Sequence, residues 1–138
     1  QPDAAFFGEK DYQQYLVIKK MTESLKLNTR IICVKTVRDR NGLPLSSRNS
    51  YLSVQEFKIA IKINKLLKKL PPLIRAKLKI NKILNHTKKV LKDHGVDKID
   101  YLTVLNDDLS VRKKINDKSR IFIAAKIGNT RLIDNIKI

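Results

Sequence analysis

A change in the spacing of apolar residues at Gly95 constrains the fold of this chain more than any other feature. Before this glycine, apolar residues recur at the helical period, which predicts helices over residues 11–26, 53–70 and 74–94. After it, short runs rich in β-branched residues alternate with turn residues, which predicts strands over residues 99–105, 120–127 and 130–136. The second part of the chain is therefore predicted to be a small α+β unit of two helices and a short antiparallel sheet.

The ends of these elements carry recognisable signals. Ser53 followed by Glu56 matches a capping box, so a helix is expected to begin there. Pro71-Pro72 is expected to stop this helix, and Gly95 to cap the next one. Turns are predicted at Asn106-Asp107-Asp108 and at Gly128-Asn129. The inward residues are expected to be Ala60, Ile63, Leu67 and Leu70 on the first helix, and Ala76, Ile80, Ile83, Leu84 and Leu91 on the second.

The first part of the chain has a different predicted architecture. A helix over residues 11–26, with Tyr15, Ile18 and Leu25 at helical spacing, precedes a short apolar strand at Arg30–Val34 that is expected to be buried. A helix followed by an apolar strand is the usual end of an α/β domain. The chain is therefore predicted to contain the end of an α/β domain in residues 1–36 and the α+β domain in residues 37–138.

Two polar segments concentrate groups that bind phosphate and hydroxyls. The first, FGEKDYQQ, begins at Phe7; glycine permits close backbone approach, and the lysine supplies a positive charge at a helix start. The second, LPLSSRNSYLS, begins at Leu43 and places two hydroxyls beside a guanidinium in a loop, which suits a polyphosphate. From the residues alone, a plain helix start and an exposed turn remain the favoured alternatives.

The net charge of +17 allows two interpretations, a binding function and compositional drift. It is compatible with binding to nucleic acid or an anionic membrane, but lysine dominates over arginine and aromatics are only 6%. We therefore favour compositional drift toward lysine. No apolar run approaches membrane-spanning length, and the single Cys33 is expected to be a small buried residue in a reducing, cytoplasmic setting. His86 and His94 lack metal-ligand spacing, so no metal site is predicted.

Taken together, the motifs are more specific than any one of them. The ordered series QPD, FGEKDYQQ, TVRDRNGLPLSSRNSYLS, IDYLTV and TRLIDNI resembles the C-terminal half of the pantoate–β-alanine ligase family over the whole chain, least so in the lysine-rich segment 58–92. The resemblance implies the end of a Rossmann-like nucleotide-binding domain followed by the α+β domain. It also implies a ligase that activates pantoate with ATP as a pantoyl adenylate and joins it to β-alanine, with magnesium accompanying the nucleotide.

The resemblance also implies roles for individual residues. Lys10 would contact the ATP phosphates, Gly8 and Asp11 would lie near the ribose, and Gln14 would bind pantoate. Val37 would contact adenine through its backbone, and Ser46 and Arg48 would stabilise the leaving pyrophosphate. The full set expected to bind ATP is Gly8, Glu9, Lys10, Asp11, Val37, Leu45, Ser46, Ser47 and Arg48.

This sequence departs from the family pattern in two places. Leu45 stands where the family usually has methionine, and no segment matches the family's MGALHxGH motif, which carries the catalytic histidines. We therefore expect a truncated chain with no catalytic residue of its own, inactive alone. A homodimer is a further expectation from the family. A basic nucleic-acid-binding module and a decayed remnant of the enzyme stay open as alternatives.

Overall fold

The structure, a computed structural model, describes residues 2–76, 79–106, 110, 115–116 and 118–138. The chain divides into two compact units, Gln1–Val37 and Arg38–Ile138. Each unit is described below by itself.

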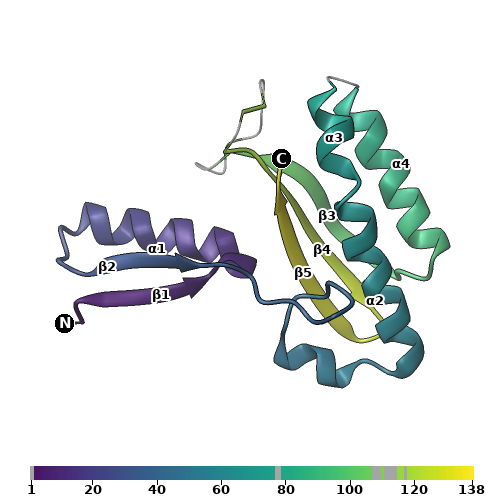
Figure 1. The fold of residues 1–138 in the computed structure, drawn as a ribbon, viewed down its shortest axis with the longest axis horizontal. Coiled ribbons are helices and arrows are strands. Elements are labelled where there is room, and N and C mark those ends of the chain that lie inside the picture. Colours follow the sequence, from purple (N-terminus) through teal and green to yellow (C-terminus); the bar gives the residue numbers. More distant parts are fainter. Residues whose placement is uncertain (1, 77–78, 107–109, 111–114, 117) are drawn as a thin grey trace. The chain divides into compact units, whose positions relative to one another are not determined.

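The first unit is a strand–helix–strand arrangement. Strand β1 (Ala4–Gly8) leads through a short 3-10 helix, η1 (Glu9–Asp11), into helix α1 (Tyr12–Ser24), and strand β2 (Arg30–Val34) follows. The two strands pair in parallel, from Ala4 opposite Arg30 to Gly8 opposite Val34, and α1 packs on the pair (Figure 1). Parallel pairing brings the carboxyl ends of both strands to one edge, where the polar segments after each strand begin.

Three features of this unit differ from the sequence prediction. FGEKDYQQ is predicted to be a polar segment, but its Phe7 and Gly8 end strand β1, for which the sequence predicts no strand. Leu16 is the buried apolar residue of α1, whereas Leu25 lies just after the end of the helix and is 62% exposed. Strand β2 has the predicted bounds, but it is half-buried rather than buried, and Cys33 with it, because only α1 covers the pair among the described residues of the unit.

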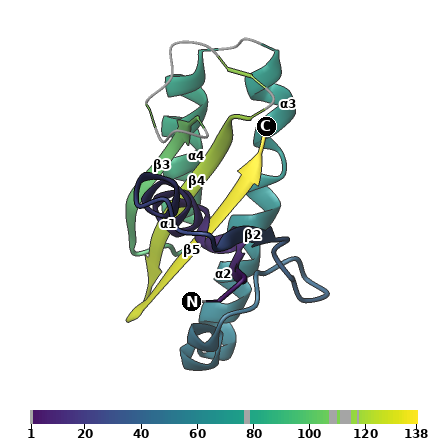
Figure 2. The ribbon, with the colours of Figure 1, turned by 90° about the vertical axis from the view of Figure 1, so that its left-hand side faces the viewer.

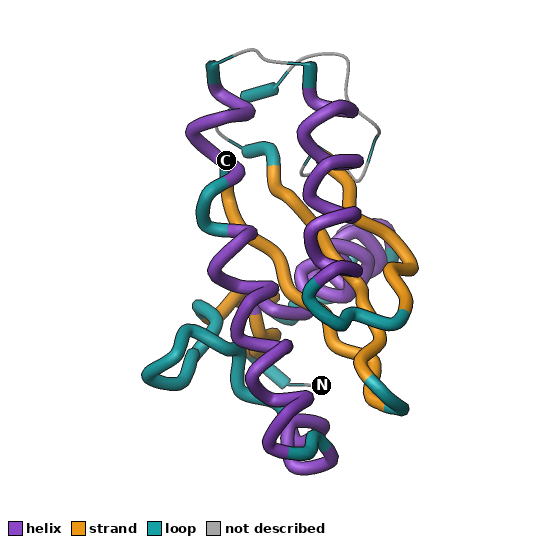
Figure 3. Tube along the Cα trace, turned by 90° about the vertical axis from the view of Figure 1, so that its right-hand side faces the viewer, coloured by secondary structure: helices purple, strands orange, loops and turns teal. Residues whose placement is uncertain are grey.

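The second unit is a three-stranded antiparallel sheet covered by helices. Strands β3 (Lys98–Leu105), β4 (Arg120–Ile127) and β5 (Thr130–Lys137) lie in that order, with β4 in the centre (Figure 2). Helices α2 (Val54–Leu67), α3 (Leu70–Arg75) and α4 (Ile80–Asp93) lie over the strands (Figure 3). The α+β architecture predicted for this part is confirmed.

The core lies between the helices and the sheet. The predicted stripe of Ala60, Ile63, Leu67 and Leu70 is buried, with at most 5% of any of these residues exposed. It packs with residues of the central strand such as Ile121 and Ile123. Burial of each leucine or isoleucine of this stripe contributes about 1.5–3 kcal/mol to folding, so this face fixes the helices on the sheet.

The two prolines begin a helix rather than only ending one. Helix α2 ends at Leu67, and Pro71 and Pro72 lie in the first turn of α3, where a missing N–H costs no helical hydrogen bond. The single helix predicted over 74–94 is therefore two helices: α3 ends at Arg75, Ala76 is exposed, and α4 begins at Ile80. Within α4, Leu84 and Leu91 are buried, while Ile80 and Ile83 are partly buried against the core.

The predicted caps and the second turn are confirmed. Ser53 accepts a hydrogen bond from the Glu56 N–H while the Glu56 carboxylate accepts one from the Ser53 N–H. Gly95 adopts φ +98° after α4, and a two-residue turn joins β4 to β5 at Gly128-Asn129. Of the other predicted turn, Asp107 and Asp108 lie outside the described residues.

Candidate functional site

The first group of predicted site residues follows strand β1. Gly8 has φ −69°, a conformation open to any residue, and a methyl group added there would meet no described atom within 4 Å. Neither backbone conformation nor packing among the described residues therefore requires glycine at this position. The Asp11 carboxylate precedes α1 but makes no capping hydrogen bond. It is exposed and engages no other group in the described chain, which leaves it open to a ligand.

Glu9 has a different environment from its neighbours. Its carboxylate accepts a hydrogen bond from the Thr36 N–H at 3.3 Å, and this bond ties the end of β1 to the segment that follows β2. Lys10 is half-buried, Gln14 is exposed on α1, and Val37 is 64% exposed. The first unit therefore brings predicted residues from both strand ends to the same edge of its parallel pair. This edge is where open α/β sheets bind their ligands.

The second group of predicted residues forms the loop before α2. Its last residues belong to a 3-10 helix, η2 (Ser47–Tyr51), where the sequence predicted an irregular loop. The Ser46 hydroxyl accepts a hydrogen bond from the Arg48 N–H at 3.2 Å and so begins this turn. Leu45, Ser47 and Arg48 are exposed. Within the described chain no hydrogen bond or ion pair engages the Arg48 guanidinium, so its donors can face an anion.

Hydrogen bonds fix this loop on both sides. On one side, the Asp39 carboxylate accepts from the N–H groups of Asn41 and Leu43, at 2.8 and 2.9 Å, and closes a tight turn. On the other, the Asn49 side chain donates to the Pro44 carbonyl at 2.9 Å. The loop is thus presented by a rigid frame, an arrangement that favours tight positioning of a ligand.

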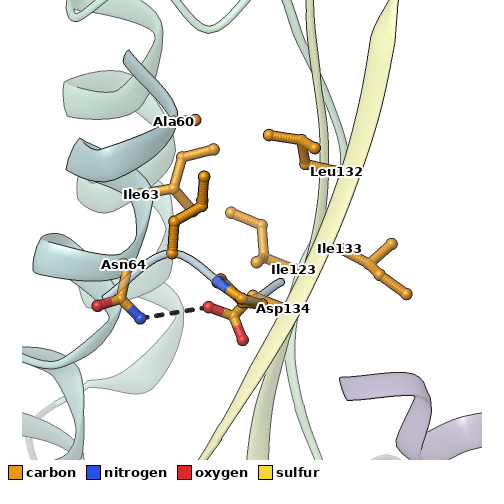
Figure 4. A pocket seen from close by; sticks show the side chains of 9 residues that line it. Ala60, Ile63, Asn64, Ile123, Leu132, Ile133 and Asp134 are labelled. Carbon is orange, nitrogen blue, oxygen red and sulfur yellow. Dashed lines mark hydrogen bonds between the residues drawn. The ribbon is translucent and has the colours of Figure 1, made fainter. Parts of the chain in front are cut away.

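An ion pair that the sequence interpretation missed anchors the start of this frame. Arg38 donates from both terminal nitrogens to the Asp134 carboxylate of β5, each at 2.8 Å, and from one of them to the Gly42 carbonyl at 3.1 Å. The Asn64 amide of α2 donates to the same carboxylate at 3.3 Å (Figure 4). Asp134 stood in the TRLIDNI motif, but no signal in the sequence links it to Arg38.

The cavity next to this ion pair is too small for a substrate. It measures about 10 Å³ and is lined mainly by apolar side chains, among them Ile63 and Ile123 (Figure 4). A single water molecule needs a space of about this size. The cavity therefore belongs to the packing of the sheet against α2.

Several charged groups outside the predicted set lie on the sheet. Arg131 donates to the Asp100 carboxylate at 2.7 Å across the sheet, and Lys98 lies 3.2 Å from the same carboxylate. The hydrogen bond from Arg131, followed by that from Lys98, lowers the pKa of Asp100, and the pair raises the pKa of Arg131.

The two histidines have structural surroundings. His94 follows α4, and its ring nitrogen lies 2.6 Å from the Val90 carbonyl, as expected for a helix C-terminus. His86 is exposed on α4.

In the described chain, no group of three or more His, Cys, Asp or Glu side chains could hold a metal ion. Nor does this part of the chain contain a helix long and apolar enough to cross a bilayer.

The fold and the polar loops define the class of the protein: the end of a Rossmann-like α/β domain followed by a small α+β unit. Comparison with known proteins narrows this class. The family model described as pantoate-beta-alanine ligase matches residues 1–137, and the chain belongs to this family.

Named relatives agree with this assignment. The pantothenate synthetase of Bradyrhizobium sp. is 41% identical over 140 residues, which cover 100% of this chain and 49% of the relative. The crystal structure of pantothenate synthetase from Thermus thermophilus matches with a TM-score of 0.90 and 33% identity, covering 99% of this chain and 50% of that one.

A further related structure contains bound ligands. The structure of pantoate-beta-alanine ligase from Francisella tularensis, complexed with beta-gamma ATP and beta-alanine, matches with a TM-score of 0.71 and 34% identity over 99% of this chain and 44% of that one. The chain thus spans about half the length of its relatives. This coverage is consistent with the C-terminal portion that the sequence motifs imply, and the predicted family and fold class are confirmed.

Proposed function

We propose that this chain carries part of the ATP and pantoate sites of a pantoate–β-alanine ligase. The observation that supports the proposal most is the family match over residues 1–137. In this proposal residues 1–36 are the end of the nucleotide-binding domain and residues 37–138 are the C-terminal domain. A biosynthetic ligase of this kind fits the predicted cytoplasmic location.

The proposed reaction has two steps. The carboxylate of pantoate attacks the α-phosphorus of ATP, forming pantoyl adenylate and releasing pyrophosphate. The β-alanine amine then attacks the activated carbonyl, forming the amide and releasing AMP. Both steps depend on alignment of the reactants and on stabilisation of phosphate charge rather than on covalent help from the protein.

The residues after β1 are proposed to hold the nucleotide. Lys10 would contact the phosphates, and Gly8 and Asp11 would lie at the ribose. Two observations support these roles: the space around Gly8 is open, and the Asp11 carboxylate is not used in a cap. Glu9 would act through its bond to the Thr36 N–H, which orders the backbone of this edge.

The remaining roles concern pantoate, adenine and pyrophosphate. Gln14 is exposed on α1, where its amide could bind the hydroxyl and carboxylate of pantoate. Val37 and Leu45, both more than half exposed, would contact adenine. Ser46, Ser47 and Arg48 would stabilise the pyrophosphate as it leaves, because hydroxyls and a guanidinium donate directional hydrogen bonds to phosphate oxygens.

The described residues contain no group of three or more His, Cys, Asp or Glu side chains that could hold a metal ion. In nucleotide sites, magnesium is usually held by one or two carboxylates together with the substrate phosphates. We therefore propose that magnesium accompanies the nucleotide. The 138 residues contain no MGALHxGH motif, so we propose that this polypeptide alone does not turn over.

A chimaeric enzyme tests the proposal. The first half of the Bradyrhizobium pantothenate synthetase would be joined to this chain, and pyrophosphate release would be measured with ATP and pantoate. We expect release that requires pantoate and is lost on Lys10→Ala or Arg48→Ala, whereas Lys58→Ala, an exposed change on α2, has no effect. The 138-residue chain alone should release none.

The refuting result is a folded chimaera, shown by a cooperative thermal transition, without pantoate-dependent release. If the chimaera does not fold, ATP titration of the 138-residue chain followed by amide NMR shifts replaces it. Shifts confined to residues around Lys10 and Arg48 support the proposal. Their absence at millimolar ATP contradicts it.

A further inference from the structure

A surface groove in the second unit brings Arg48 together with a distant turn. The groove has a volume of about 520 Å³, within the roughly 300–1,000 Å³ typical of small-molecule sites. It is lined by Arg48, Tyr51, Glu56, Asn129, Thr130 and Arg131. The last three residues come from the β4–β5 turn and the start of β5 and were given no role by the sequence.

Contacts between the β4–β5 turn and neighbouring side chains fix the walls of this groove. The Gly128 N–H donates to the Asp97 carboxylate at 2.6 Å, and Gly128 itself has φ +54°. A methyl group added at Gly128 would overlap the Glu56 carboxylate, so the turn packs directly on the first turn of α2. Glu56 is in turn fixed by the capping box with Ser53. A groove with fixed walls loses little entropy when it binds a ligand.

The charges of the groove favour an anion. Arg48 is exposed, and its guanidinium makes no hydrogen bond or ion pair with other described residues. The Arg131 side chain is 48% exposed; its bond to Asp100 uses the Nε–H donor, and it also interacts with Tyr101. A guanidinium carries about five N–H donors, so others can face a ligand. Two carboxylates lie near these positive charges: that of Glu56, which already accepts the Ser53 N–H at 2.7 Å, and that of Asp100, which also pairs with Lys98 at 3.2 Å. With Lys98 counted, the positive charges remain in excess.

We propose that this groove binds a diphosphate group, with Arg48 and Arg131 as its two guanidinium ligands. The inference rests on the proposed function, in which Arg48 meets the pyrophosphate of ATP, and adds Arg131 on β5 as a second ligand. One guanidinium can donate two parallel hydrogen bonds to the oxygens of a single phosphate. Two arginines that line one groove therefore match a ligand with two phosphates better than one with a single phosphate. Asn129 also lines the groove, and its amide can act as a further donor.

Binding of inorganic pyrophosphate to the 138-residue chain, measured by calorimetry at 0.15 M salt, tests the inference. Loss of a hydrogen bond to a charged group weakens binding by about 10- to 100-fold, which is the effect expected of Arg131→Gln and of Arg48→Gln. Lys137→Gln removes the same charge at the far end of β5 and should leave affinity unchanged. Orthophosphate should bind more weakly than pyrophosphate.

Two further variants separate ligand binding from a structural role. Glu56→Gln removes the negative charge while glutamine can still complete the capping box, so binding should strengthen. Asp100→Asn breaks the ion pair but keeps Arg131, so binding should stay the same or strengthen. If Arg131 acted only through its ion pair, Asp100→Asn would weaken binding as much as Arg131→Gln.

Three results would overturn the inference. These are no saturable pyrophosphate binding, equal affinity for orthophosphate, and unchanged affinity in Arg131→Gln beside a loss in Arg48→Gln. The last result would leave the proposed function intact. The proposed function is judged separately, by pantoate-dependent release in the chimaera.

Discussion

Replacing Arg38 by methionine is expected to destabilise the second unit strongly. The guanidinium of Arg38 makes two hydrogen bonds of 2.8 Å to Asp134, and the side chains of the pair are only 22% and 5% exposed. Methionine keeps most of the aliphatic stem and removes the charge. The Asp134 carboxylate would then remain buried with two neutral donors, the Asn64 amide and the Asn135 N–H.

The magnitude follows from this geometry. Removing one partner of a buried ion pair costs about 3–5 kcal/mol, because the other charge stays buried without compensation. Two neutral donors remain, and Arg38 is partly exposed, so we take the lower end, about 3 kcal/mol. For a unit of this size, that loss lowers the melting temperature by at least about 12 °C.

Urea unfolding followed by circular dichroism measures the effect, with a double-mutant cycle over Arg38→Met and Asp134→Asn. The double variant has no buried charge to leave uncompensated, so it should be less destabilised than the sum of the two single variants by about 1.5 kcal/mol or more. Asp100→Asn is the matched control, since it breaks an ion pair of similar length on the exposed face of the sheet. A small effect of Arg38→Met together with additivity in the cycle would refute the reasoning.

Three further predictions concern single positions. Gly42→Ala should destabilise the second unit by about 1–3 kcal/mol in urea unfolding. Gly42 has φ +86°, and a Cβ added there would lie 2.5 Å from the Asn64 amide oxygen. The control Gly8→Ala should leave stability unchanged, and an equal loss in both variants would contradict the prediction. Ser53→Ala removes the cap of α2 and should cost about 1 kcal/mol in the same assay, whereas no loss would show that the cap is dispensable. The lowered pKa of Asp100 means that its contribution to stability is present above pH 3.8 and is lost as the pH falls through the folded-state pKa; carboxyl NMR should place that pKa below 3.8, and a value at or above 3.8 would contradict the ion pair.

The elements that could be predicted are those with local signals. The capping box and apolar stripe of α2 are complete within a few residues. The apolar runs of β4 and β5, bounded by turn residues, predict the bounds of β4 and all but the last residue of β5. Strand β1 was missed because AAFFG is short, half-buried and without alternation. The two prolines were read as a stop, although the same chemistry suits the first turn of α3.

The residues of the candidate site also fall into those with a local sequence signal and those without one. The loops around Lys10 and Arg48 are visible as polar motifs, so the sequence could name their residues. The Arg38–Asp134 pair and the meeting of Arg48 with Arg131 could not be named, because each joins residues far apart in the chain. Charge and sequence spacing do not show which of the many lysines and arginines lie close to a given residue in the fold. The register of β5 and the packing of α2 determine these contacts.

The parallel pair of β1 and β2 has a consequence for amide exchange. An isolated two-stranded sheet is marginally stable in water, and only α1 covers this one among the described residues of its unit. In the 138-residue chain, amides of β2 should therefore exchange through openings that cost little free energy, while those of β4, buried in the centre of its sheet, should exchange only when the whole unit unfolds. A ligand seated on Lys10 would slow the first set and leave the second unchanged. Exchange rates in β2 are thus a sensitive reporter of nucleotide binding to this polypeptide.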